Sequence, residues 1–327
     1  MARLRIAAAI PATTDYATTR AACGAAEAHG FDAWARPDHL LAEGVLGPPG
    51  APLLECFTTT AALVEATSRI RFLQTVACNS FRHPALLAKM VASLDVISGG
   101  RMELGLGAGW LQREYEAYGY DFPPTAVRLA QLREALQIVK RLWTGEAVDY
   151  DGAHYRLRDA VCAPAPVQRP RPPILVGGGG AGLLAVAAAE ADVVNIVPPT
   201  SHGASDVELV RRFTIERFRA KAGRVRELAA AAGRDPNALT LSAIFFVQLA
   251  ASEAKAAELL DAVGARYRLD RAAAERFPLV LVGTPAQLRE RLAERIAILE
   301  LGYVVLNFAD ADALARFAAD VLPSLRT

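Results

Sequence analysis

Apolar runs alternate with amphipathic segments along most of the chain. Eight runs are continuous enough to be buried strands, and they begin near residues 4, 32, 70, 102, 173, 193, 240 and 303. Segments with apolar residues at helical spacing separate most of these runs, and helices are expected over 15–31, 53–69, 84–98, 206–233, 252–277 and 284–302. Strands that alternate with helices pair in parallel, so eight such units predict an α/β fold, a closed (β/α)8 TIM barrel. A doubly wound sheet is the alternative topology.

One segment departs from this regular alternation. The stretch 111–170 is longer than a single crossover requires, so we expect it to be an insertion after strand 4. Within it, the alternating residues 147–159 surround Asp151-Gly152, which predicts a hairpin. No shift in composition marks a boundary, so residues 1–327 are expected to form a single domain.

The composition restricts the partners of the protein. The 36 basic and 35 acidic residues give a net charge of +1, so nothing builds the basic face that nucleic acid requires. The four cysteines form no CxxC pair, which is typical of a reduced compartment and predicts neither a disulfide framework nor a metal site. The first apolar run lacks the features of a signal peptide, and no uncharged run reaches the roughly 20 residues that span a bilayer. We therefore expect a cytoplasmic protein without membrane association.

Polar residues stand at the predicted carboxyl ends of strands, where barrels carry their active sites. The second strand ends in Asp38-His39 and the third in Cys78-Asn79. His39 can donate a proton or a hydrogen bond to a heteroatom, and Asp38 can fix its tautomer or accept an N–H from a ring. A loop histidine without a catalytic role is the alternative. His83 precedes a predicted helix and is expected to cap it.

Two glycine-rich turns follow strands. In "SGGRMELGLGAGW", Gly105, Gly107 and Gly109 stand at alternate positions, but a dinucleotide fingerprint needs its third glycine one residue later, where Trp110 stands. The second turn, Gly177–Gly180, leads from a strand into a helix, where backbone N–H groups can approach a phosphate. A side chain at either of its two middle glycines is expected to block that approach without unfolding the barrel. A tight turn without a ligand is the alternative for each.

Four long segments carry a resemblance to a known family. They are "WARPDHL", "FRHPALLAKMVASLDVISGGRMELGLGAGWLQREYEAYG", "LREALQIVKRLWTGEAVDYDGAHYRL" and "PRPPILVGGGG". Together they resemble the bacterial luciferase-like monooxygenase superfamily, and most closely its coenzyme F420-dependent oxidoreductase branch. The resemblance covers nearly the whole chain and implies a flavin or deazaflavin on the C-terminal face of a bacterial-luciferase-like barrel.

The resemblance also implies which residues form the site. His39 matches the usual catalytic candidate, and Asp38 stands beside it near the ring. A non-proline cis peptide is implied within 75–77, and the glycines after the fifth strand match the turn that holds the cofactor phosphate. The residues implied to line the cofactor site are Asp38, Thr75, Val76, Ala77, Asn79, Gly107, Ala108, Gly109, Gly177, Gly178, Gly179 and Gly180. In sugar-phosphate dehydrogenases of the branch, a glutamate stands where this chain has Trp110, which argues against a sugar-phosphate substrate.

The activity that the resemblance implies is hydride transfer between coenzyme F420 and a small organic substrate not yet identified. An FMN-dependent monooxygenase that works with a separate flavin reductase is the first alternative. A barrel that binds a flavin without catalysis is the second, and the intact Asp38-His39 pair argues against it. We also expect a homodimer.

Overall fold

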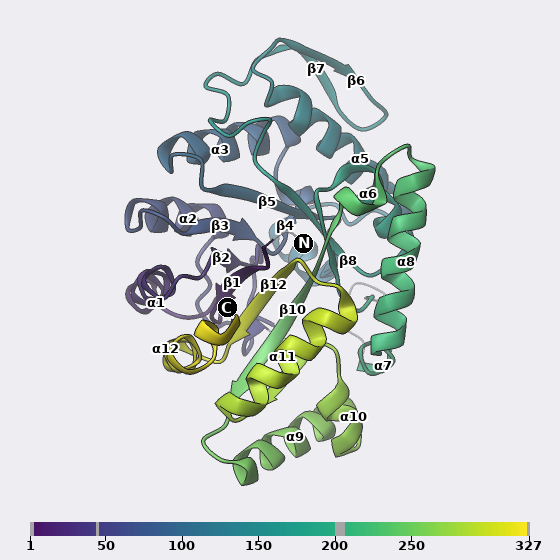
Figure 1. The fold of residues 1–327 in the computed structure, drawn as a ribbon. Helices are drawn as coiled ribbons and strands as arrows, with labels where there is room; N and C mark the ends of the chain where they lie inside the picture. The colour runs from purple at the N-terminus through teal and green to yellow at the C-terminus, as the bar shows by residue number, and fades with distance from the viewer. Residues whose placement is uncertain (1–2, 44–45, 200–206, 326–327) are drawn as a thin grey trace.

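Eight parallel strands close into a barrel in this computed structural model, which describes residues 3–43, 46–199 and 207–325. The strand order is β1-β2-β3-β5-β8-β9-β10-β12, and the pairing of β12 with β1 completes the ring (Figure 1). The strands are β1 (Arg5–Ala9), β2 (Ala33–Arg36), β3 (Arg71–Gln74), β5 (Met102–Gly107), β8 (Ile174–Gly178), β9 (Val193–Ile196), β10 (Thr240–Leu249) and β12 (Tyr303–Phe308). The predicted (β/α)8 barrel is therefore confirmed.

Helices surround the barrel and form its outer layer (Figure 1). They are α1 (Tyr16–Ala28), α2 (Cys56–Glu65), α3 (Pro84–Ile97), α4 (Gln112–Tyr118), α5 (Thr125–Leu142), α6 (Ala181–Glu190), α7 (Val207–Arg211), α8 (Ile215–Ala231), α9 (Glu253–Tyr267), α10 (Arg271–Arg276), α11 (Pro285–Leu299) and α12 (Ala311–Asp320). Local capping sets several boundaries. The predicted cap at His83 is confirmed, since its Nδ1 accepts the N–H of Ala85 at 3.2 Å and Pro84 occupies the first turn.

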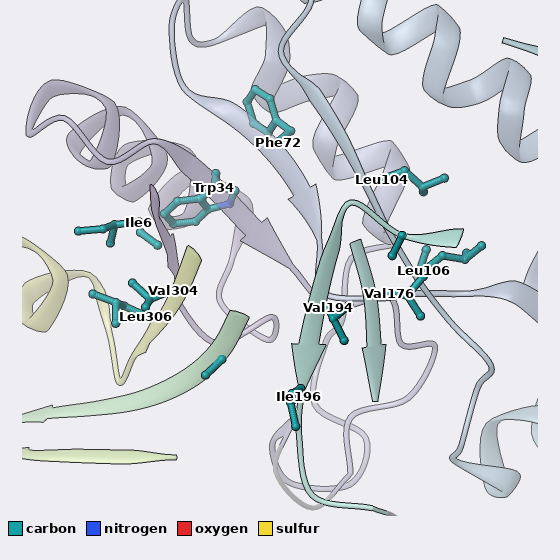
Figure 2. Close-up of a cluster of buried hydrophobic side chains, with 14 of the residues drawn as sticks. Ile6, Trp34, Phe72, Leu104, Leu106, Val176, Val194, Ile196, Val304 and Leu306 are labelled. Atoms are coloured by element: carbon teal, nitrogen blue, oxygen red, sulfur yellow. The ribbon is translucent and has the colours of Figure 1, made fainter. Parts of the chain in front are cut away.

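Large apolar side chains on the outer faces of the strands pack against the helices. Figure 2 shows ten of them, which are Ile6, Trp34, Phe72, Leu104, Leu106, Val176, Val194, Ile196, Val304 and Leu306. All are at most 2% exposed. Because side chains alternate along a strand, the residues between them point into the barrel.

The barrel interior is filled mostly by smaller apolar side chains, together with the larger Tyr303 and the charged Glu103. The apolar residues there are Ala7, Ala9, Ala33, Ala35, Leu73, Leu175, Val193, Tyr303 and Val305. Glu103 lies in the same layer and accepts hydrogen bonds from Arg5 at 3.1 Å and Arg71 at 2.5 Å. The interior is therefore a packed core, and chemistry is confined to the ends of the strands.

The segment between β5 and β8 holds α4, α5 and the antiparallel hairpin of β6 (Val148–Asp151) and β7 (Arg156–Ala160), so the predicted hairpin is confirmed. Glu134 on α5 fixes the hairpin turn by accepting the N–H groups of residues 153–155. Asp95 on α3 accepts the backbone N–H groups of Val167 and Gln168. The hairpin is thus attached to α5, and the chain that returns to β8 is attached to α3.

Two segments that were each predicted to be one continuous helix are divided into two helices. The segment 252–277 is broken into α9 and α10 because Arg268 adopts a φ of +54° and Asp270 caps a new helix. The predicted helix 206–233 is likewise two helices, and Thr214 caps the second; residue 206 lies outside the described residues. A ninth parallel strand, β11 (Val280–Gly283), pairs with β10 outside the barrel. A short β4 (Ala77–Cys78) continues β3 and pairs with β5.

Among the described residues, no helix combines the length and the apolar character that crossing a membrane would require. In the same part of the chain, no three His, Cys, Asp or Glu side chains are grouped as metal ligands would be.

Candidate active site

The C-terminal ends of the barrel strands gather the residues that the sequence singled out. His39 follows β2, Asn79 follows β4, and the two glycine turns follow β5 and β8. Register pairing places β4 beside β5 and β5 beside β8, so these ends are adjacent along one rim. The site is built from this rim.

His39 is held by a buried carboxylate that sequence reasoning did not identify. Its Nδ1 lies 2.8 Å from Oε2 of Glu114, on α4. The other oxygen, Oε1, accepts the backbone N–H groups of Leu40 at 2.6 Å and Leu41 at 3.0 Å. The Glu114 side chain is 2% exposed and that of His39 is 15% exposed. One carboxylate therefore fixes both the ring and the loop that carries it.

The indole of Trp110 also contacts the ring of His39. The two rings meet edge to face, with centroids 5.8 Å apart and planes at 79°. The indole therefore occupies the position at which the resemblance places a catalytic glutamate in sugar-phosphate dehydrogenases. The wall beside His39 is apolar and aromatic at this point.

Asp38 does not orient His39, which corrects one of the two roles that the sequence suggested for it. Both of its oxygens accept from the guanidinium of Arg82, at 2.7 and 3.0 Å, and Oδ2 also accepts the N–H of Cys78 at 3.0 Å. Arg82 donates to Glu55 as well, at 2.5 Å. Burial acts to lower the pKa of Arg82, but Asp38 and then Glu55 outweigh it and raise that pKa. Asp38 is 2% exposed, so it serves as the anchor of a buried ion pair.

The end of β3 contains a cis peptide bond between Thr75 and Val76, inside the segment predicted for it. The Val76 side chain turns toward the two glycine strands. A Cβ on Gly107 would lie 2.6 Å from Val76 Cγ2, and a Cβ on Gly177 would lie 2.8 Å from Val76 Cγ1. The glycines at these two positions therefore accommodate Val76, which is a packing reason for them.

Gly109 has a similar packing reason. It adopts a φ of +76°, and a Cβ there would overlap the hydroxyl of Tyr115. That hydroxyl is buried between Cys78 Sγ at 3.1 Å and Ser80 Oγ at 3.0 Å. Burial, followed by the neighbouring Cys78, raises the pKa of Tyr115 well above its ordinary value, and burial raises the pKa of Cys78 to about 11. Neither group is suited to proton transfer near neutral pH.

The glycines Gly178, Gly179 and Gly180, at the end of β8 and just after it, divide into two kinds. A Cβ on Gly178 would lie 2.7 Å from Leu183, and one on Gly179 would overlap the carbonyl oxygen of Val197, so a side chain at either strains the fold itself. This corrects the expectation that such substitutions report on a ligand alone. Gly180 is exposed, has ordinary N-cap angles of −78° and 148°, and faces open space. It precedes the ten-residue helix α6, whose first N–H groups have no intrahelical acceptor.

A lysine from α8 reaches the same turn. Lys221 Nζ donates to the carbonyl oxygen of Gly179 at 2.5 Å. Partial burial, and then the charge of Arg217, lower the pKa of Lys221. Lys221 therefore brings a positive charge to the turn before α6, an arrangement that suits an anionic group.

Asn79 and His83 occupy the remaining positions at this rim. The Asn79 amide donates to the Tyr155 hydroxyl at 3.3 Å, while its Oδ1 is buried and has no hydrogen-bond partner within the described chain. His83 is an exposed helix cap that meets Tyr155 edge to face. Asn79 therefore offers a free acceptor, and His83 has a structural task.

Comparison with known proteins identifies a family and several relatives that this chain resembles. Residues 1–299 match the sequence profile of the family described as luciferase-like monooxygenase. An uncharacterized protein of Mycobacterium tuberculosis is 35% identical over 176 residues, which cover 50% of this chain and 61% of that protein. An F420-dependent glucose-6-phosphate dehydrogenase of Gordonia bronchialis is 32% identical over 198 residues, which cover 56% of this chain and 57% of that enzyme. The matches thus span about three fifths of the length of these curated relatives.

Solved structures share the fold over its full length. An EDTA monooxygenase from Chelativorans sp. BNC1 has a TM-score of 0.82 at 16% identity, covering 99% of this chain and 94% of that one. An F420-dependent secondary alcohol dehydrogenase has a TM-score of 0.80 at 17% identity, covering 99% and 100%. The fold and the profile match over residues 1–299 agree, and the chain belongs to the luciferase-like monooxygenase family.

Proposed function

We propose that the protein transfers a hydride between coenzyme F420 and a small organic substrate at the C-terminal face of the barrel. The observation that carries the proposal is the His39–Glu114 pair, which holds an imidazole at a strand end on the same rim as the exposed start of α6. One part of this rim is suited to move a proton and the other to hold an anion. F420 supplies a hydride acceptor or donor when it is bound.

The residues at the rim fit the parts of such a cofactor. The backbone of Gly180 and the next two residues would hold the phosphate, because helix N-termini favour anions and this one is exposed. Lys221 adds positive charge there. The unpartnered Oδ1 of Asn79 would accept an N–H from the ring system. The packing roles of Gly107, Gly109 and Gly177 are compatible with backbone approach on their other side.

His39 would exchange the proton that accompanies hydride transfer. A carboxylate only accepts hydrogen bonds, so the contact with Glu114 stabilises a positively charged imidazole after it has taken a proton. General acid–base catalysis of this kind contributes about 10²- to 10⁴-fold in rate. The proton-transfer role therefore falls on His39 and not on Tyr115, whose hydroxyl is buried.

The surroundings of His39 favour an uncharged substrate. Trp110 meets its ring edge to face, and the two residues that follow His39 in the chain, Leu40 and Leu41, are aliphatic. Arg82, a cation on the same rim, is already paired with two carboxylates. We infer an alcohol or carbonyl compound without a phosphate group.

F420 is preferred to FMN because curated relatives of known activity, from Gordonia bronchialis and Microbacterium testaceum, are F420-dependent. The test is titration of the purified protein with F420 and with FMN, followed by ring fluorescence. We expect F420 to bind at micromolar concentration or below, equivalent to about −8 kcal/mol or better, and more tightly than FMN. FMN that copurifies, together with no response to F420, would establish the monooxygenase with a separate reductase instead.

A further inference from the structure

We propose that Glu114 is a positioning residue that fixes the tautomer of His39 and thereby makes Nε2 the proton-accepting atom of the site. The inference rests on the proposed function only for the identity of the proton donor. Its structural part concerns the free protein and can be tested without cofactor or substrate.

The hydrogen bonds of Glu114 leave it one possible role toward His39. Its Oε1 is occupied by the N–H groups of Leu40 and Leu41, at 2.6 and 3.0 Å. Its Oε2 lies 2.8 Å from Nδ1 of His39. All three contacts come from the consecutive residues His39, Leu40 and Leu41. Oε1 accepts two backbone N–H groups, and glutamate side chains are ordinarily ionised near neutral pH, so Oε2 is an acceptor as well.

An ionised carboxylate has no proton to donate, so Nδ1 must carry the proton in this contact. In a neutral imidazole the other nitrogen is then unprotonated. Within the described residues Nε2 of His39 has no hydrogen-bond partner, and the side chain remains 15% exposed. Glu114 therefore presents a neutral ring with a free lone pair on Nε2.

The proton step that follows is simple. The O–H bond of a substrate alcohol breaks, its electron pair stays on the oxygen, and the proton forms a new bond to Nε2. The ring becomes an imidazolium, whose charge Glu114 stabilises across the 2.8 Å contact. The reverse step returns the proton to a developing alkoxide.

The variant Glu114→Gln should change the tautomer of His39 without changing the structure of the loop that carries it. The glutamine Oε1 can still accept from Leu40 and Leu41, so the loop keeps its hydrogen bonds. The amide NH2 then takes the place of Oε2 and donates to Nδ1, which must accept. The proton of the neutral ring is thereby moved to Nε2.

The measurement is 15N NMR of protein labelled at its five histidines, recorded as the pH is raised until the rings are neutral. The His39 signals are assigned by their loss in His39→Gln. We expect a protonated Nδ1 and a bare Nε2 in the wild-type protein and the opposite pattern in Glu114→Gln. Glu116→Gln, an exposed change on the same helix, is the matched control and should leave the pattern unchanged.

Two results would overturn the proposal. One is a wild-type ring protonated at Nε2, which the wild-type spectrum alone reveals even if the variant fails to fold. The other is a folded Glu114→Gln protein with an unchanged tautomer. With a substrate in hand, Glu114→Gln should lower kcat for alcohol oxidation by about 10²-fold or more at unchanged cofactor affinity. An expected tautomer pattern in a protein that does not bind F420 would reject the proposed function and leave this inference intact.

Discussion

The carbonyl oxygen of Gln74 occupies the space that a side chain on Gly105 would need. Gln74 ends β3, and the backbone there passes so close to β5 that a Cβ on Gly105 would overlap it. The first glycine of "GLGAG" is therefore a condition for the close approach of two barrel strands. Backbone cannot rotate out of the way as a side chain can.

Gly105→Ala should destabilise the protein by about 3 kcal/mol or more, because the new methyl group would overlap backbone atoms, which cannot rotate away as a side chain can. The control is Gly24→Ala in the middle of α1, where a Cβ would meet nothing within 4 Å. That change should stabilise the protein by about 0.5–1 kcal/mol, since alanine favours helix. Urea unfolding of both variants measures the two effects. A Gly105→Ala protein as stable as the wild type would contradict the described register at this crossing.

His39→Ala should lower turnover by about 10²-fold or more and leave cofactor affinity nearly unchanged, because the proposed phosphate site is at α6, away from His39. His154→Ala, at an exposed position of the hairpin turn, is the control and should keep full activity. Thermal melts of both variants exclude a loss of folded protein as the cause. Nearly full turnover in folded His39→Ala would remove the proton-transfer role from this residue.

Asp38→Ala should act mainly on stability, by about 3 kcal/mol, because it leaves Arg82 partly buried with only Glu55 as a counterion. Asp151→Ala removes two exposed ion pairs, with Arg156 and Arg158, and should cost at most about 1 kcal/mol. Denaturant titration compares the two. If Asp38→Ala were as stable as the wild type and instead lost cofactor affinity, the ring-binding role implied by the family resemblance would stand.

Gly180 allows phosphate binding to be tested without strain. Asp is a better N-cap residue than Gly, so Gly180→Asp should keep or raise the stability of α6. Its charge should repel a phosphate at the same place and weaken F420 binding by about 10-fold or more. Gly180→Ser, an equally good cap without charge, should bind more tightly than Gly180→Asp. Equal affinities for the two variants would place the phosphate elsewhere.

Asp192 provides a pH-dependent stability term at the N-terminal end of the barrel. Burial acts to raise its pKa, but Arg171, at 2.6 and 2.9 Å, and the N–H of Ile174 outweigh burial and lower the pKa below 3.8. The ionised carboxylate therefore stabilises the fold fully when the pH is above the ordinary pKa of an aspartate. This stabilisation is lost as the pH falls through the lower pKa of Asp192 in the folded protein.

Asp192→Asn should therefore be less stable than the wild type at pH 7, by about 1 kcal/mol after allowance for partial exposure. The difference should stay constant down to about pH 5 and shrink as the pH falls below the ordinary pKa of an aspartate. Unfolding free energies of both proteins at a series of pH values check this. A difference that does not change with pH would mean that the carboxylate contributes no charge interaction.

The barrel could be predicted because each of its strands is a local apolar run and most of its helices have apolar residues at helical spacing. The cap at His83 and the hairpin are also local. The His39–Glu114 contact was not predictable in this way, since its partners are 75 residues apart and no spacing rule connects them. The same holds for Asp38 and Arg82, 44 residues apart.

The helix break at Arg268 escaped prediction for a different reason. Apolar spacing continues on both sides of it, so the pattern has no visible gap. The break depends on a left-handed backbone at a residue that is not glycine, together with the Asp270 cap. Tertiary packing here overrides a continuous local pattern.

The contact of Val76 with Gly107 and Gly177 has a consequence for how this site can evolve. The valine side chain fills the space on both strands, so neither glycine can gain a Cβ while it is present. A relative with alanine or glycine at position 76 would have room for alanine at both of the other positions. The three positions should therefore change together across the family, and an ancestor that altered only one of them would have passed through a less stable barrel.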